Sequence, residues 1–453
     1  MNKKVSPKVT VYIVSHNYGK FLEKSIDSVI NQTFSDWELI IIDDCSSDNT
    51  IDIARKYIKK KSTKIILLQN KKNKGLQKIA NEAARKASGE YILRLDADDY
   101  LHSDALEMLY AKAESNPGAS LIYSNFYYID EIGNIIGQEN SLNRVSDGEA
   151  SDLIAPHGAC SLIPLSLLHS VGGYNENINA QDGWDIWYKL SKVGKCLKIE
   201  NPLFYYRQHS TSLSKDHNRL IKARNKIIDS NLRFQHDNTR PNCYCVLPIK
   251  EKFPTLSENL NVNGLELVLH TIRQALSVDY VDMVVIPTES INIKQDIIKN
   301  LSADELLSIT FIIRDQSNPS FKSVPILEII NKVRANLESQ NILIPNYWLY
   351  LGVMAKFREV EHITRAMNLI DNFNYDSLVS VVEERSPVFQ IGKGSLEILN
   401  PGRFNNLEYH DEKIMRYNES LILLRDKSIH MSNFLSKKVG YLEMTQAESV
   451  KWS

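Results

Sequence analysis

The chain has 453 residues, more than a single ordinary hydrophobic core accommodates, so two domains are expected. Its hydrophobic content of 43% is typical of a folded globular protein. Its formal net charge of −1 gives no electrostatic preference for nucleic acid, so we expect no nucleic-acid partner. No apolar run approaches the ~18–20 residues that span a bilayer, and the N-terminal residues lack the apolar segment of a signal peptide.

The cysteines are scattered and lack the paired spacing of metal ligands. Five are present: Cys45, Cys160, Cys196, Cys243 and Cys245. Cys243 and Cys245 flank one tyrosine on a predicted strand, which favours small core residues over a ligand pair. This cysteine usage predicts a protein of the reducing cytoplasm.

Strand and helix patterns alternate over the first hundred residues. The predicted strands are residues 9–14, 37–42, 64–68 and 91–95, and the predicted helices are residues 18–30, 50–60 and 75–87. This order requires an α/β fold with a mostly parallel sheet and helices on both faces. Ligands of such sheets bind beyond the carboxyl ends of the strands.

Acidic side chains follow the fourth predicted strand in the run LRLDADD. Asp96 and Asp98 are two residues apart, so on an extended backbone their side chains point the same way. Two hard oxygen ligands suit Mg²⁺ or Mn²⁺, and a metal held there could grip a nucleoside diphosphate. By itself the run is a weak signal, because acidic turns are common.

Polar residues also follow the first and second predicted strands. Ser15 and Asn17 follow the first, and Asp43 and Asp44 follow the second. With the acidic run, three polar clusters are predicted at one edge of the sheet, which makes coincidence the weaker explanation. An alternative for the Asp43-Asp44 pair is capping of the next helix, although the serines and aspartate that follow could do this unaided.

Two long segments carry a family resemblance. VSHNYGKFLEKSIDSVINQTFSDWELIIIDDCSSDNT and NKGLQKIANEAARKASGEYILRLDADD resemble glycosyltransferase family 2, the nucleotide-diphospho-sugar transferases with a GT-A type, Rossmann-like sheet. The resemblance covers about residues 8–215. It implies a Mn²⁺ or Mg²⁺ cofactor, a UDP-sugar as the expected donor and a saccharide or lipid-linked saccharide as acceptor.

The resemblance also implies roles for the polar clusters. Asp43 and Asp44 would accept hydrogen bonds from the nucleoside, in a pocket that Ser15 and Asn17 also line. Asp96 would face the ribose or the metal. Asp98 would coordinate the metal between the two phosphates.

A second chemical cluster begins at Gln181-Asp182. An inverting transfer needs a base that takes the proton of the acceptor hydroxyl, and one carboxylate within hydrogen-bond reach suffices. The family places an acidic pair here with its second member as the base, which implies Asp182 as the general base. Gln181 departs from the acidic pattern, and Asp185 is expected to cap or brace the helix that follows.

Residues 205–214 resemble the family's closing loop, which would exclude water from the donor. Arg207 and His209 would approach the phosphates or the metal, and Ser212 and Ser214 could donate hydrogen bonds. The alternative is an ordinary polar loop. His157 could touch the diphosphate or the acceptor, but a lone histidine is more often structural.

Residues 235–242 are polar and predict a linker between a first domain at residues 1–238 and a second at residues 242–453. The second half has a further α/β alternation and resembles, more faintly, the cytidylyltransferases that make CMP-activated acidic sugars. Its phosphate-loop segment, IKEKFP, lacks glycine, so a domain retained for dimerisation or docking is expected. Lys250, Asn259 and Arg314 could still bind a nucleotide or sugar acid.

The combined prediction is a cytoplasmic, metal-dependent inverting glycosyltransferase of bacterial surface polysaccharide synthesis. Two alternatives remain: a bifunctional enzyme with an active CMP-sugar synthetase half, and a non-catalytic scaffold. Basic runs at residues 55–61 and 71–74 could meet the inner face of a membrane, but a solvated helix face is the preferred interpretation.

Overall fold

The computed structural model describes residues 6–60, 64–139, 157–209, 216–232, 242–249, 263–313, 325–391, 396–399, 414–429 and 438–452. The chain divides into two compact units, residues 1–227 and 228–453. Residues 235–241 of the predicted linker lie outside the described ranges, so the predicted domain boundary stays a prediction. None of the helices in these ranges is both long and apolar enough to cross a membrane.

The first unit alternates strands and helices in the predicted order. Its elements are β1 (Val9–Ser15), α1 (Gly19–Ile30), β2 (Trp37–Asp43), α2 (Thr50–Lys60), β3 (Ile65–Gln69), α3 (Leu76–Lys86), β4 (Tyr91–Asp96), β5 (Tyr100–Leu101), α4 (Ala105–Glu114), β6 (Ala119–Ile129), β7 (Ile135–Gln138), β8 (Leu162–Pro164), α5 (Leu165–Ser170), α6 (Asp182–Ser191), β9 (Lys195–Arg207) and most of α7 (His217–Asn231).

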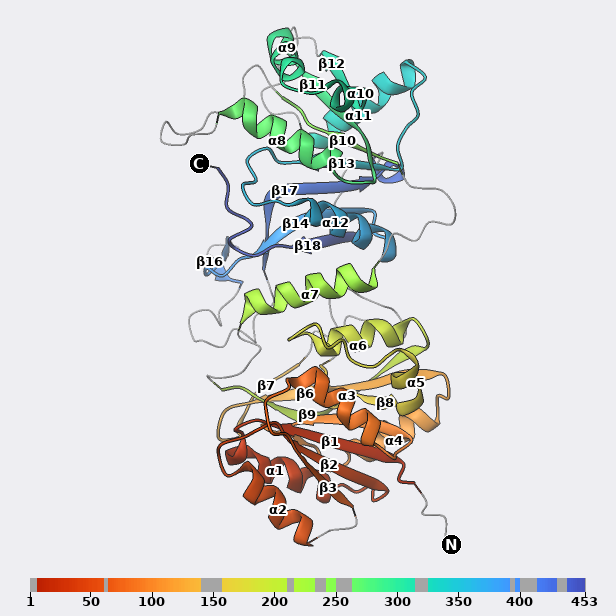
Figure 1. The fold of residues 1–453 in the computed structure, drawn as a ribbon, viewed down its shortest axis with the longest axis vertical. Coiled ribbons are helices and arrows are strands. Elements are labelled where there is room, and N and C mark those ends of the chain that lie inside the picture. Colours follow the sequence, from red (N-terminus) through yellow and green to blue (C-terminus); the bar gives the residue numbers. More distant parts are fainter. Residues whose placement is uncertain are drawn as a thin grey trace. The chain divides into compact units, whose positions relative to one another are not determined.

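One mixed sheet organises this unit (Figure 1). Its order over the described residues is β3-β2-β1-β4-β8-β6-β9-β5, with β7 beside β6. The first four strands are parallel, and right-handed crossovers place α1 and α2 on one face and α3 on the other. Apolar runs such as WELIIID are buried along almost their whole length, as a sheet covered on both faces requires.

The second unit has its own sheet. Its elements are β10 (Cys243–Val246), α8 (Gly264–Leu276), β11 (Val281–Thr288), α9 (Ile291–Lys299), α10 (Ala303–Leu307), β12 (Ile309–Ile313), α11 (Ile326–Ser339), β13 (Tyr347–Leu351), α12 (Val360–Asn372), β14 (Ser377–Glu383), β15 (Phe389–Ile391), β16 (Leu396–Ile398), β17 (Met415–Arg425), a 3₁₀ turn (Asp426–Ser428) and β18 (Val439–Glu443). The strand order is β12-β11-β10-β13-β17-β14-β18, mostly parallel.

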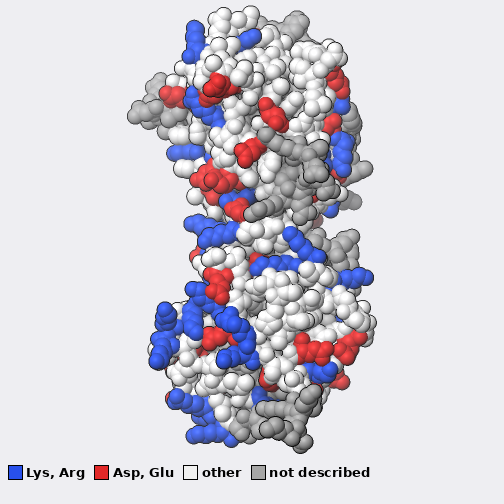
Figure 2. Space-filling model, turned by 45° about the vertical axis from the view of Figure 1, so that its right-hand side comes forward, with Lys and Arg blue, Asp and Glu red and all other residues white. Residues whose placement is uncertain are grey.

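The predicted fold class, α/β with a mostly parallel sheet and a second α/β domain, is therefore confirmed. Cys243 and Cys245 are fully buried in β10, as predicted for small core residues. On the face drawn in Figure 2, both units carry basic and acidic side chains, in keeping with the near-zero net charge.

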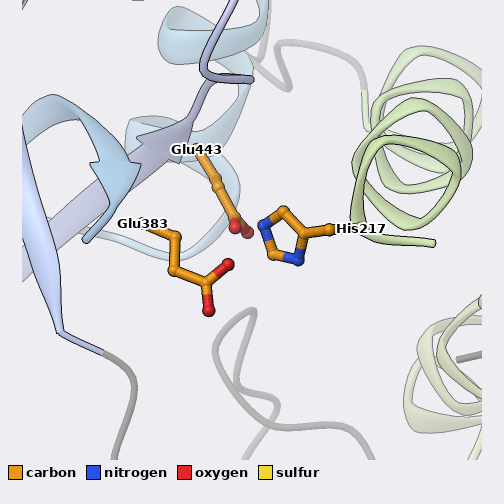
Figure 3. A group of neighbouring side chains, drawn as sticks. All are labelled: His217, Glu383 and Glu443. Atoms are coloured by element: carbon orange, nitrogen blue, oxygen red, sulfur yellow. The ribbon is translucent and has the colours of Figure 1, made fainter. Parts of the chain in front are cut away.

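Two buried glutamates end neighbouring parallel strands of the second unit. Glu383 is the last residue of β14 and Glu443 the last residue of β18. Figure 3 draws them with His217, which belongs to the first unit. Because the positions of the two units relative to each other are not determined, these three residues carry no site assignment.

Candidate active site

The carboxyl ends of three neighbouring strands bring the predicted polar clusters to one edge of the first sheet. Ser15 ends β1 opposite Asp43 of β2, and Val14 of β1 lies opposite Asp96 of β4. Parallel pairing therefore places the loops after all three strands side by side. The predicted convergence is confirmed.

The loops after β1 and β2 are joined by hydrogen bonds. Asn17 Oδ1 accepts from the backbone N–H of Ser47 at 2.8 Å, and the backbone N–H of Asn17 donates to Ser46 Oγ at 2.9 Å. Asn17 has a φ of 61°, a conformation that asparagine tolerates better than most residues. Ser15 is buried, with its Oγ 3.4 Å from Thr50 Oγ1.

Asp43 and Asp44 differ in how their carboxylates are used. Asp44 accepts from the backbone N–H groups of Lys74 and Gly75 at 3.0 and 3.1 Å and from Asn70 Nδ2 at 3.0 Å. It therefore anchors the loop before α3. Asp43 Oδ1 accepts only from a backbone N–H at 3.2 Å, and its buried Oδ2 has no partner among the described residues. Of the two, Asp43 has the carboxylate oxygen left for a ligand.

A buried guanidinium joins the acids at the end of β4 to the start of α6. Arg94 Nη1 donates to Asp182 Oδ2, and Arg94 Nε lies 3.0 Å from Asp96 Oδ1. Asp182 is the first residue of α6 and follows Gln181, whose φ of 59° turns the chain into the helix. The predicted base and a predicted metal ligand therefore share one cation.

Asp96 is held in an unfavourable place for a carboxylate. Burial raises the pKa of Asp96, Arg94 opposes this shift, and the charges of Asp98 and Asp182 add to it, so that the pKa is about 6. A carboxylate whose pKa is raised by neighbouring acids lies in an environment that a divalent cation relieves.

Asp98 and His209 form the other half of the candidate metal centre. Asp98 Oδ2 lies 2.9 Å from His209 Nε2, and the imidazole ring packs against the rings of Tyr18 and Phe21, each with a centroid distance of 5.7 Å. An aspartate oxygen and an imidazole nitrogen within hydrogen-bond distance are donors that Mn²⁺ accepts. The residues present thus fit a divalent cation.

Arg207 is occupied by backbone carbonyls. Its Nε donates to the carbonyl oxygen of Asp98 at 2.7 Å, and its Nη1 to those of Asp130 and Glu131 at 3.1 and 2.8 Å. Its backbone N–H donates to Asp99 Oδ1 at 2.8 Å. Arg207 thus braces the metal loop in this structure, and its predicted contact with the donor stays a prediction.

Two further residues respond strongly to burial. Burial, followed by the charges of Asp98 and Asp96, raises the pKa of Asp99 well above its ordinary value. Burial and nearby Arg94 lower the pKa of His157 to about 4, so this histidine is neutral at physiological pH. His157 Nδ1 accepts from a backbone N–H at 3.1 Å, which gives it at least one structural role.

Some predictions fall outside the described ranges or concern supporting residues. Ser212 and Ser214 of the expected closing loop lie outside them. Asp185 is fully buried and accepts from the backbone N–H of Asn175 and from Lys189, the bracing role that was expected.

Sequence reasoning did not assign a role to Arg94. The signal was present: a charged residue in the middle of the strand YILRLD, whose inner positions are otherwise apolar and buried. A buried arginine is rare unless paired, so its position in the strand predicts carboxylate partners.

Comparisons with known proteins identify the first unit. Residues 10–165 match the family model for glycosyl transferase family 2. Chondroitin synthase of Pasteurella multocida is 29% identical over 201 residues, which are 44% of this chain and 20% of that protein. TuaG of Bacillus subtilis, whose name assigns it to teichuronic acid biosynthesis, is 38% identical over 101 residues, 22% of this chain and 40% of that protein.

The chain thus spans less than half the length of these relatives. The crystal structure of S. aureus TarS residues 1–349 aligns with 49% of this chain and 65% of that chain at a TM-score of 0.40 and 20% identity, a similarity too slight to carry an argument about ligands. The family match and the related sequences agree on the same region. The N-terminal region of this chain is a glycosyltransferase family 2 domain.

Proposed function

We propose that the first unit transfers a sugar from a nucleoside-diphosphate donor to a saccharide hydroxyl, with inversion at the anomeric carbon and with a divalent cation. One observation carries the proposal: Asp96 and Asp182, from two distant parts of the sequence, meet at Arg94 at the carboxyl edge of the sheet, and the charge of Asp98 acts on Asp96 there. UDP is the nucleotide to test first.

Asp98, His209 and Asp96 would hold Mn²⁺ or Mg²⁺. The cation would neutralise the two phosphates of the donor and make the nucleoside diphosphate a better leaving group. On the nucleoside side, Asp43 offers a carboxylate oxygen that has no partner among the described residues, in a pocket that Ser15 and Asn17 would line, while Asp44 and Arg207 would act by bracing their loops.

In the proposed step Asp182 takes the proton of the acceptor hydroxyl. The acceptor oxygen forms a bond to the anomeric carbon as the bond from that carbon to the phosphate oxygen breaks. The nucleoside diphosphate leaves with the electron pair of the broken bond. Because attack and departure are on opposite sides of the sugar, the configuration inverts.

The relatives' names support a place in polysaccharide synthesis. A chondroitin synthase and a teichuronic acid glycosyltransferase both bear names of polysaccharide assembly. A saccharide or lipid-linked saccharide is therefore the acceptor class that we propose. A cytoplasmic location, with peripheral contact at the inner membrane face, is part of the same proposal.

For the second unit we propose a cytidylyltransferase-like domain that has lost activity and serves self-association. Residues 250–262, which lie outside the described ranges, contain no glycine that could let the backbone approach a triphosphate. The bifunctional alternative requires the release of pyrophosphate from CTP and a sugar acid. The scaffold alternative requires that no nucleotide sugar be turned over.

The deciding experiment measures nucleotide release. The purified chain is incubated with Mn²⁺ and a panel of UDP-, GDP-, CDP- and CMP-sugars, beside the variants Asp98→Ala and Asp182→Ala. We expect release from one diphospho-sugar, abolished by EDTA and reduced by about 10²-fold or more in each variant. Exposed Asp52 on α2 gives a matched control, since Asp52→Ala should leave release unchanged.

Turnover of CTP without nucleotide release from any diphospho-sugar would contradict the proposal and would assign the activity to the second unit. Release that survives both Asp98→Ala and EDTA would contradict the metal centre alone.

A further inference from the structure

Arg94 is a buried cation between the proposed metal ligands and the proposed base. Its side chain is 5% exposed and lies in a strand whose neighbouring positions are apolar. Asp182 is 88 residues away in sequence and reaches Arg94 from the first turn of α6. Asp96 reaches the same guanidinium from two residues along β4. One planar side chain therefore fixes two carboxylates from different elements.

The surroundings leave little freedom to this pair. A Cβ atom at Gly158 would lie 2.8 Å from Arg94 Nη2 and 3.0 Å from Asp182 Oδ2, so glycine provides the space that the pair fills. Tyr12, which lies opposite Arg94 in β1, donates to the hydroxyl of Tyr174 at 3.2 Å in the buried layer beside it. The guanidinium is therefore enclosed by neighbouring groups.

From this geometry we infer that Arg94 is a positioning residue that orients Asp182 to accept the acceptor's proton. The inference rests on the proposed function. Arg94 binds Oδ2 of Asp182, so Oδ1 is the oxygen assigned to the proton. A guanidinium suits the task better than an ammonium, because its fixed fork of N–H donors sets the orientation of both carboxylates at once.

A positioning role and a purely structural role predict opposite effects on metal binding. Arg94 places a positive charge next to Asp96, and like charges repel. If the cluster stays intact, removal of Arg94 should therefore leave Mn²⁺ binding as tight as before or tighter. If Arg94 merely keeps the site folded, its removal should weaken Mn²⁺ binding and turnover together.

The test compares Arg94→Gln, Arg94→Lys, Asp182→Asn and the double variant Arg94→Gln/Asp182→Asn in the full chain. Mn²⁺ affinity is measured from the electron paramagnetic resonance signal of the free ion. Turnover is measured as nucleotide release from the donor that the panel identifies, with water as acceptor, and gives kcat and KM separately. Arg55→Gln, an exposed arginine on α2, is the matched control.

We expect Arg94→Gln to lower kcat about 10²-fold, the size of a general-base contribution, with donor KM within about threefold of the wild type and Mn²⁺ affinity unchanged or higher. Arg94→Lys should have a kcat about tenfold higher than Arg94→Gln, because lysine restores the positive charge but not the planar set of N–H donors. The double variant should be no slower than Asp182→Asn, because Arg94 acts through Asp182.

Three outcomes would overturn the inference: unchanged kcat in Arg94→Gln, losses that multiply in the double variant, or Mn²⁺ binding lost in step with kcat. If Arg94→Gln fails to fold, Arg94→Lys and the charge-balanced double variant decide, with circular dichroism as the check on folding. A wild-type chain that releases no nucleotide rejects the proposed function itself, whereas a wild-type chain whose kcat is insensitive to Arg94 rejects this inference alone.

Discussion

Asp96 combines a site role with a cost to stability. Burial and the neighbouring charges of Asp98 and Asp182 raise its pKa to about 6 from an ordinary value of 3.8, with Arg94 opposing the shift. The unfolded chain therefore loses this proton more readily than the folded chain. Above pH 6 the ionised Asp96 side chain destabilises the fold, and this contribution of Asp96 is removed as the pH falls from 6 towards 4.

Replacement of Asp96 by Asn should therefore raise the melting temperature of the metal-free chain at pH 7.5, because a neutral amide carries no ionisation penalty. The gain should shrink as the pH falls through 6 and vanish near pH 4. Thermal melting between pH 4 and 7.5 checks this, with Asp52→Asn as an exposed control. A lower melting temperature at every pH would mean that pairing with Arg94 outweighs the repulsion.

At the scale of single residues, sequence reasoning located the acids but not their partners. Asp96 and Asp98 follow β4 at the carboxyl edge of the sheet, because parallel pairing leaves one place for strand-end residues, and Asp182 is the first residue of α6. The partners of Arg207 were not predictable. Its guanidinium donates hydrogen bonds to the backbone carbonyls of residues 98, 130 and 131. Contacts between a side chain and a distant backbone do not produce a pattern that can be recognised in a sequence.

At the scale of elements, one aspartate holds two helix N-termini. Asp48 Oδ2 accepts from the backbone N–H of Gly19, the first residue of α1, at 2.8 Å. Asp48 Oδ1 accepts from the backbone N–H and the hydroxyl of Thr50, the first residue of α2, at 3.0 and 2.6 Å. A carboxylate at this point satisfies unpaired donors of both helices and complements both helix dipoles.

Asp48→Ala should therefore destabilise the first unit by about 1–2 kcal/mol, the usual cost of a lost cap, while Asp48→Asn should retain most of the stability. Burial opposes ionisation of Asp48, but hydrogen bonds from Thr50 and Gly19 prevail and lower its pKa. Its contribution is thus present at neutral pH and lost as the pH falls through that lowered value. Urea unfolding at pH 7 and pH 3 measures both effects, and equal losses in the Ala and Asn variants would contradict the capping role.

Elements with strong apolar runs were predicted within a residue or two. The strand expected at residues 37–42 is β2 (Trp37–Asp43), and the helix expected at residues 75–87 is α3 (Leu76–Lys86). The long strands β6 and β9 were not predicted. Both carry polar and aromatic residues, and they become strands because they pair with each other along most of their length, a tertiary effect that a local pattern does not contain.

At the scale of the whole molecule, each unit has a complete sheet with its own buried core. Val11, Leu39 and Leu95 are fully buried in the first, and Val246, Leu349 and Leu423 in the second. Proteins built this way unfold domain by domain unless a large apolar interface couples the parts. The proposed donor and metal residues all belong to the first unit.

Calorimetry of the full chain should therefore show two transitions, of which Mn²⁺ with UDP moves one. At a ligand concentration 100 times Kd the bound unit gains about 2.7 kcal/mol, which corresponds to a rise of several degrees for a unit of this size. The variant Asp98→Ala should abolish the shift and leave the other transition in place. A single transition that moves as a whole on ligand binding would mean that the two units unfold as one cooperative body.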